Sequence, residues 1–134
     1  MKQDARKKAE TSADNAVFDA ARTLAGAVAV SEPFQEFEAA LNAFQSNEKA
    51  RELLSDYRKA ERKAQMEMSW GGISQGTEEK LSRREHETRA DPVISRYFAS
   101  QEALVGELKE LNAYITKKIG FDFADMVKPA GGCC

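Results

Sequence analysis

The sequence is poor in the residues that cross-link a fold, break helices or carry acid–base chemistry. It contains two cysteines, three prolines and one histidine in 134 residues. The cysteines, Cys133 and Cys134, are adjacent, so a disulfide between them could not join distant parts of the chain. The histidine, His86, lies among charged residues in the polar segment RREHETR and is interpreted as a solvated surface residue. The sequence has no second histidine to activate a serine or cysteine nucleophile, and the polar segment around His86 does not suggest the pocket that a general base needs. We therefore expect no hydrolase chemistry, and no enzyme.

Long apolar runs and an excess of one charge are also missing. The longest mainly apolar run, AARTLAGAVAV at residues 20–30, is about half the roughly 20 residues that a membrane span requires. The polar N-terminus has no apolar segment of the secretory type. Lys and Arg number 20 against 22 Asp and Glu, a net charge of −2 that provides no overall field for a polyanion. These features predict a cytoplasmic protein that is not bound to membranes, and leave nucleic-acid binding uncertain.

What the sequence does have is the composition and periodicity of long helices. Hydrophobic residues make up 42% and charged residues 31% of the chain, and no strand pattern or fixed repeat is visible. Apolar residues recur every three or four positions, which predicts helices at about residues 12–30, from Ser31 onward, at 47–70 and at 91–119. The segment WGGISQG, residues 70–76, predicts a loop or hinge. Residues 77–90 are nearly all polar, so a helix there would bury little.

These elements predict an all-α fold, an extended bundle of about four to five helices with long antiparallel helices. We expect a single helical domain over residues 1–128, whose residues 1–11 form a polar extension, and a flexible tail at 129–134. The two longest helices would each measure roughly 35 to 40 Å, more than a compact bundle of this mass needs. A second helical chain, in a homodimer or in a hetero-oligomer with related helical proteins, is therefore expected to complete the bundle, with coiled-coil packing.

Two groups of side chains are candidates for contacts with other molecules. Gln101 interrupts the apolar stripe of the last long helix, where a polar residue can fix the register of paired helices, and the predicted pairing residues are Gln101, Leu104, Leu108 and Leu111. The locally basic segments RKAERK and SRREHETR predict contacts with RNA or an acidic partner through Arg62, Lys63, Arg83 and Arg84. A solvated charged face is the alternative for the basic segments, as it is for the carboxylates Glu48, Glu52 and Asp56.

The terminal PAGGCC offers the only thiols of the chain. Thiolates suit zinc, Cu(I) or an Fe–S cluster, and such sites usually use four of them. Cys133 and Cys134 could therefore supply part of a metal or Fe–S site that is shared between chains. An inert tail, lipid attachment and an added thiol handle are the alternatives.

The helix patterns resemble one family. The stretches TLAGAVAVSEPFQEFEAALNAFQSNEKARELLSDYRKAERKAQ and DPVISRYFASQEALVGELKELNAYITKKIGFDF are similar to the YlbF/YmcA family over about residues 16–123. The resemblance implies an all-α, dimer-forming regulatory protein without enzymatic activity. It also implies assembly with a further protein, YaaT, in a complex linked to competence, sporulation, biofilm formation and RNase Y-dependent mRNA processing. That complex binds Fe–S clusters through cysteines, to which only Cys133 and Cys134 correspond here.

Overall fold

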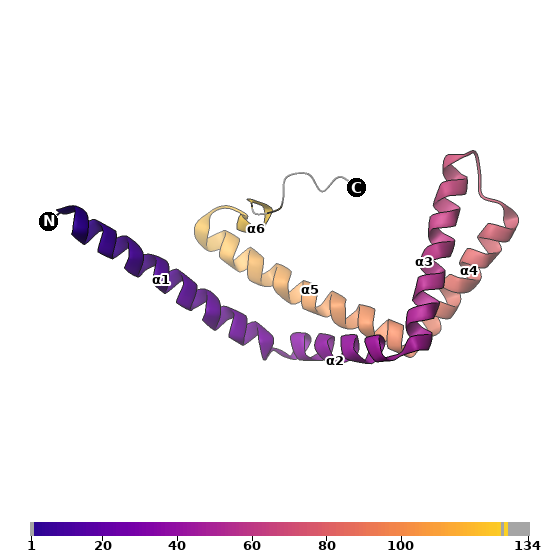
Figure 1. The fold of residues 1–134 in the computed structure, drawn as a ribbon, viewed down its shortest axis with the longest axis horizontal. Helices are drawn as coiled ribbons and strands as arrows, with labels where there is room; N and C mark the ends of the chain where they lie inside the picture. Colours follow the sequence, from indigo (N-terminus) through magenta and orange to yellow (C-terminus); the bar gives the residue numbers. More distant parts are fainter. Residues whose placement is uncertain (1, 127, 129–134) are drawn as a thin grey trace. The chain divides into compact units, whose positions relative to one another are not determined.

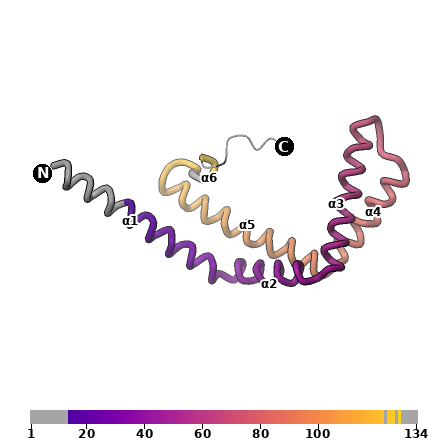
Figure 2. The backbone as a smooth tube through the Cα atoms, in the orientation of Figure 1, coloured from indigo at the N-terminus to yellow at the C-terminus, as the bar shows by residue number. Residues whose placement is uncertain are grey.

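The described part of the chain is entirely helical in its regular structure. The structure is a computed structural model that describes residues 2–126 and 128, with side chains at 14–122, 124–126 and 128. Figures 1 and 2 show the order of the helices, which are α1 (Lys2–Ala29), α2 (Glu32–Ser46), α3 (Glu48–Ser69), α4 (Gln75–Ala90), α5 (Pro92–Ile119) and the short α6 (Phe123–Met126). The prediction of an all-α fold with four to five substantial helices is confirmed.

Contacts within the chain divide it into two compact units, Met1–Gln35 and Glu36–Cys134. The first unit consists mainly of α1, and the second contains most of α2 together with α3 to α6. The prediction of a single domain over residues 1–128 stays a prediction.

Helix α1 begins earlier than the apolar pattern indicates. The pattern predicts a start near Ser12, whereas the helical backbone begins at Lys2. Residues 2–11 contain no Gly or Pro and are mostly Ala, Lys, Arg, Gln and Glu, which have high helix propensity. The helix therefore extends through residues that have no apolar stripe, and the expected polar extension is part of it.

A small apolar core lies where α2, α3 and α5 meet. Ala50, Leu54 and Ile94 are buried, and the half-buried side chains packed against them are Phe44, Leu53, Tyr57 and Val93. Ile94 is 1% exposed and is the largest fully buried side chain within the described residues. The Tyr97 ring stacks on Phe44 with 5.1 Å between the ring centroids. Close by, Arg96 forms a two-bond ion pair with Glu36, at 2.7 and 3.0 Å.

Helices α3 and α4 form an antiparallel hairpin (Figure 1). Ala60, Ala64 and Thr77 are buried along it, so the two backbones can approach closely. The predicted glycine break is confirmed as the loop between the two helices, where Gly71 and Gly72 have φ angles of 118° and 142°. Because side chains disfavour positive φ, glycine suits both positions. The polar segment 77–90 is helical, and Gln75 and Gly76 already belong to α4.

Candidate protein-interaction surface

Helix α5 carries a row of exposed apolar side chains at coiled-coil spacing. Phe98, Val105 and Leu108 are 42%, 41% and 42% exposed, and Ile119 is also exposed. Together with three further positions they follow a strict seven-residue pattern, which we call the α5 seam: Phe98, Gln101, Val105, Leu108, Asn112, Ile115 and Ile119. A seam of this spacing is the surface that one helix offers to another in a coiled coil.

Gln101 lies within the seam with its side chain exposed. Its amide has no hydrogen-bond partner among the residues that the structure describes. Asn112, a second polar seam residue, donates from Nδ2 to Asp122 Oδ1 at 3.2 Å, while its Oδ1 is buried and has no partner there. Polar residues at single seam positions can fix the register and number of paired helices.

The four predicted pairing residues lie on two neighbouring faces of α5. Leu104 is 8% exposed and Leu111 is half-buried, so both pack within the chain. Gln101 and Leu108 are exposed, so both remain accessible. Their common role in pairing with another chain stays a prediction.

A pocket lined by α3, α4 and α5 adjoins the seam at Phe98. Its volume is about 340 Å³, and its apolar lining includes Leu54, Tyr57, Ile94 and Phe98. The charged side chains that line it are Arg58, Glu61, Glu85 and Arg89. Burial, followed by the negative charges of Glu61 and Glu85, raises the pKa of the Tyr57 hydroxyl. An apolar pocket with charged neighbours can receive a large side chain from a partner.

The basic residues predicted from the sequence are only partly brought together. Arg62 on α3 and Arg83 on α4 are exposed. Lys63 Nζ lies 3.7 Å from Glu67 Oε1. Arg84 Nη1 donates to Glu87 Oε2 at 2.7 Å, and Arg84 Nη2 lies 3.8 Å from Asp56 Oδ2. Of the four, Lys63 and Arg84 line one groove between α3 and α4.

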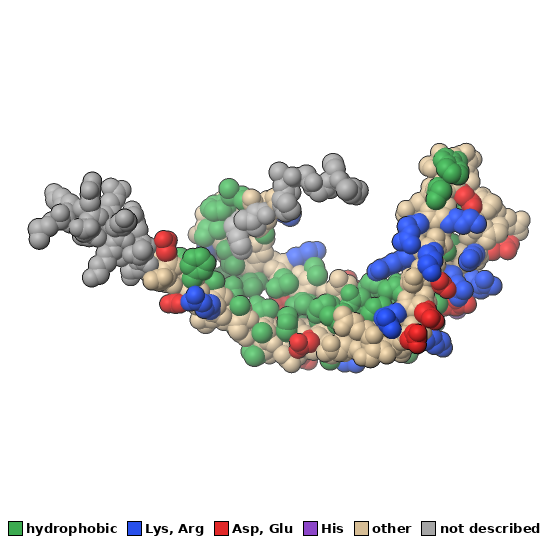
Figure 3. Space-filling view, viewed as in Figure 1, with side chains coloured by type: hydrophobic (Ala, Val, Ile, Leu, Met, Phe, Trp, Pro, Cys, Tyr) green, Lys and Arg blue, Asp and Glu red, His purple; other side chains and the backbone are tan. Residues whose placement is uncertain are grey.

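Two further lysines line that groove and were missed by the sequence prediction. The groove has a volume of about 190 Å³ and is lined by Asp56, Lys59, Ala60, Lys63, Thr77, Lys80 and Arg84. Lys59 is four residues before Lys63, and Lys80 is four residues before Arg84, so each pair lies on one face of its helix. The spacing of four residues within each pair is the sequence signal from which the two further lysines could have been predicted. Figure 3 shows Lys and Arg side chains gathered over α3 and α4.

Sequence comparison identifies the family of this chain. The model of a family described as control of competence regulator ComK, YlbF/YmcA, matches residues 17–120. The chain belongs to the YlbF/YmcA family. The resemblance read from the helix patterns is thereby confirmed, and the family is a regulatory one.

A solved structure has a similar fold. It is the X-ray crystal structure of Bacillus subtilis RicA in complex with RicF, with a TM-score of 0.64 and 16% sequence identity. The similarity covers 84% of this YlbF/YmcA chain and 96% of the other. At this identity the likeness concerns the fold. Among curated proteins, no significant match was found.

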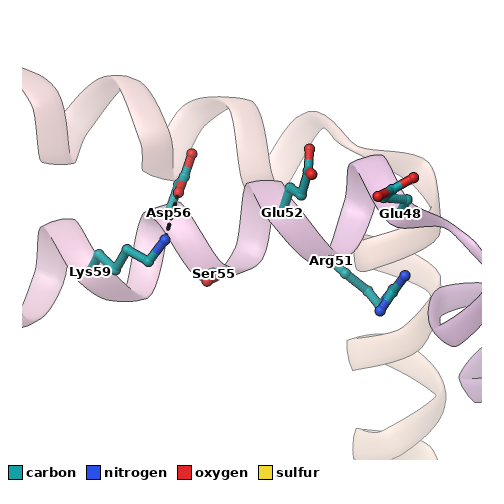
Figure 4. Close-up of a pocket in the computed structure, with 6 residues that line it drawn as sticks. All are labelled: Glu48, Arg51, Glu52, Ser55, Asp56 and Lys59. Atoms are coloured by element: carbon teal, nitrogen blue, oxygen red, sulfur yellow. Dashed lines mark hydrogen bonds and ion pairs between the residues drawn. The ribbon is translucent and has the colours of Figure 1, made fainter.

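Of the carboxylates on α3, Glu48 and Glu52 are exposed, and Asp56 is half-buried beside the groove. Figure 4 shows Glu48, Glu52 and Asp56 along α3, with Lys59 bonded to Asp56 at 3.3 Å. No group of three or more His, Cys, Asp or Glu side chains that could hold a metal occurs within the described residues. His86 is exposed on α4, as its interpretation as a surface residue predicts.

The predicted thiol site cannot be placed on this YlbF/YmcA fold. Cys133 and Cys134 lie outside the described residues, so their contribution to a shared metal or Fe–S site stays a prediction. None of the described helices combines the length and hydropathy needed to cross a bilayer. Localisation in the cytoplasm and membership of an RNase-associated complex also stay predictions.

Proposed function

We propose that this YlbF/YmcA protein is a non-enzymatic regulatory adaptor that acts by pairing its α5 seam with a second helical chain. The exposure of Phe98, Val105 and Leu108 at seam spacing carries the proposal. Apolar side chains left in water at this spacing gain free energy when a second helix covers them. The solved structure of similar fold is itself that of a complex between two proteins, RicA and RicF, which supports a pairing role.

The second chain that we propose is another copy of this one. An amide side chain both donates and accepts hydrogen bonds, so two Gln101 side chains can bond to each other across a twofold axis. A purely apolar partner would leave the Gln101 amide unpaired on burial, which costs about 1 to 3 kcal/mol. Self-pairing through Gln101 therefore combines burial of the apolar seam residues with a defined register.

Light scattering after size-exclusion chromatography tests the proposal. The wild-type protein should have a mass twice the 14.9 kDa of one chain. The double variant Val105→Glu/Leu108→Glu should be a monomer, because four carboxylates would meet in the paired seam. Circular dichroism should show that the helices persist in the variant.

The matched control places the same charges on exposed positions outside the seam. Ala103 and Ala113 are exposed on α5, so Ala103→Glu/Ala113→Glu should remain dimeric. A wild-type monomer at high protein concentration, or equal loss of the dimer in both double variants, would contradict pairing through the seam.

A further inference from the structure

We propose that the groove between α3 and α4 binds a phosphate group. Four cationic side chains line it, Lys59 and Lys63 from α3 and Lys80 and Arg84 from α4, against one carboxylate, Asp56. The hairpin sets the two pairs opposite each other, so charges that are about twenty residues apart in the sequence surround one small space. This proposal is independent of pairing through the seam.

The nearby carboxylates do not neutralise these cations fully. Asp56 is shared between two of these cations, because its oxygens lie 3.3 Å from Lys59 Nζ and 3.8 Å from Arg84 Nη2. The partner of Lys63 is Glu67, which also accepts hydrogen bonds at the α3–α4 turn. Lys80 has no ion pair within the described residues. An excess of positive charge therefore remains in the groove, where a phosphate would replace weak ion pairs by charge-assisted hydrogen bonds.

Arg84 has an unused donor. Its Nε is buried and has no hydrogen-bond partner in the described part of the chain, while its two terminal nitrogens face Glu87 and Asp56. A buried donor without an acceptor is destabilising, so a small turn of the Arg84 side chain toward an anion in the groove would give Nε the acceptor that it lacks. The planar guanidinium is also the side chain best suited to phosphate oxygens.

The groove is large enough for a phosphate group but too small to enclose a larger ligand. Its volume of about 190 Å³ is below the roughly 300 to 1,000 Å³ of pockets that enclose drug-sized ligands. The small side chains Ala60 and Thr77 also line the groove. The ligand would therefore present a phosphate to the groove and keep the rest of its structure outside. A free inorganic or nucleotide phosphate and the backbone of single-stranded RNA share this chemistry.

A titration followed by ¹⁵N–¹H correlation spectra tests the groove with inorganic pyrophosphate, at an ionic strength kept constant with sodium chloride. We expect saturable shifts at amides of α3 and α4 around Lys59 and Lys80. Lys80→Ala should weaken binding about tenfold, as expected for the loss of one charged hydrogen-bond donor, and Lys80→Arg should retain it. Lys109 is exposed on α5, so Lys109→Ala removes the same charge elsewhere and should leave the affinity unchanged.

A second titration with a labelled single-stranded uridine oligonucleotide distinguishes the two sources. If the protein binds the RNA tightly, and if Lys80→Ala weakens that binding while Lys109→Ala does not, the ligand of the groove is a phosphodiester backbone. Binding of pyrophosphate alone, with the same dependence on Lys80, would assign it to a free phosphate. The proposal is overturned if neither ligand causes saturable shifts beyond those of chloride. It is equally overturned if Lys80→Ala and Lys109→Ala weaken binding alike.

Discussion

Among single residues, Glu67 joins the end of α3 to the start of α4 by three hydrogen bonds. Its Oε2 accepts hydrogen bonds from Ser74 N at 2.9 Å and Ser74 Oγ at 3.0 Å. Its Oε1 accepts one from Thr77 Oγ1 at 2.8 Å. These bonds, that from the Ser74 backbone first, hold the pKa of Glu67 below its ordinary value of 4.5. One carboxylate from the end of α3 thus binds the first turn of α4, where negative charge is favoured.

Replacing Glu67 should loosen the hairpin in a pH-dependent way. A lowered pKa means that the folded state favours the ionised form, so its stabilisation is complete above the ordinary pKa and is lost as the pH falls through the lowered one. Thermal unfolding should therefore show a lower Tm for Glu67→Ala at neutral pH, and a smaller difference from wild type at about pH 3.

The control for this prediction is Glu52→Ala, the same change at an exposed position of α3. It should leave the Tm nearly unchanged at both pH values. A Tm difference for Glu67→Ala that is the same at both pH values would show that the carboxylate charge is not the cause.

Among the helices, α5 connects the core to the seam, and its first turn is fixed by Asp91. Asp91 Oδ1 accepts hydrogen bonds from the backbone N–H groups of Val93 and Ile94, both at 3.0 Å. Pro92 follows at the first helical position, where its missing N–H costs nothing. At the other end Gly120, with a φ of 82°, caps the helix. By fixing the first turn of α5, the Asp91 cap also fixes the position of Ile94 in the core.

Removing the cap should destabilise the protein without unfolding α5. Asp91→Ala should lower the free energy of unfolding by about 1 kcal/mol, the usual cost of a lost N-cap. Asp91→Asn keeps an oxygen acceptor and should retain most of the stability. Urea denaturation of the three proteins measures both changes, and equal losses in the two variants would contradict a capping role.

The sequence predicts the helices better than it predicts the contacts between them. Asp91 with Pro92, the glycines at 71 and 72, and the apolar spacing of α5 each determine local structure, so they could be read directly. The early start of α1 could not be predicted from the apolar pattern, because residues 2–11 are helical through their helix propensity and have no apolar stripe. The groove was missed because Lys59 and Lys80 become neighbours only when the hairpin forms. Likewise, nothing local marks Glu67 as the acceptor for Ser74 and Thr77.

For the whole molecule, the small core makes pairing relevant to stability. Ile94 is the one large side chain fully buried among the described residues, whereas several seam residues stay exposed. If the seam is covered by a second copy, folding and association are coupled and the apparent stability depends on concentration.

The Tm of the wild-type protein should therefore rise with its concentration. A hundredfold increase in concentration should raise it by about 5 °C for a dimer of this size. Val105→Glu/Leu108→Glu should unfold at a Tm that does not vary with concentration. Calorimetric scans at several concentrations measure this, and a constant wild-type Tm would contradict coupled association.

The hairpin of α3 and α4 also has a consequence for the kinetics of folding. The Thr77 to Glu67 hydrogen bond spans only ten residues, and loops of that length close in roughly 10 to 100 ns. The Arg96 to Glu36 ion pair beside the core joins residues 60 apart, and the closure of longer loops costs more entropy. Within one chain we therefore expect the hairpin to form before α2 docks on α5, because the hairpin closes the shorter loop.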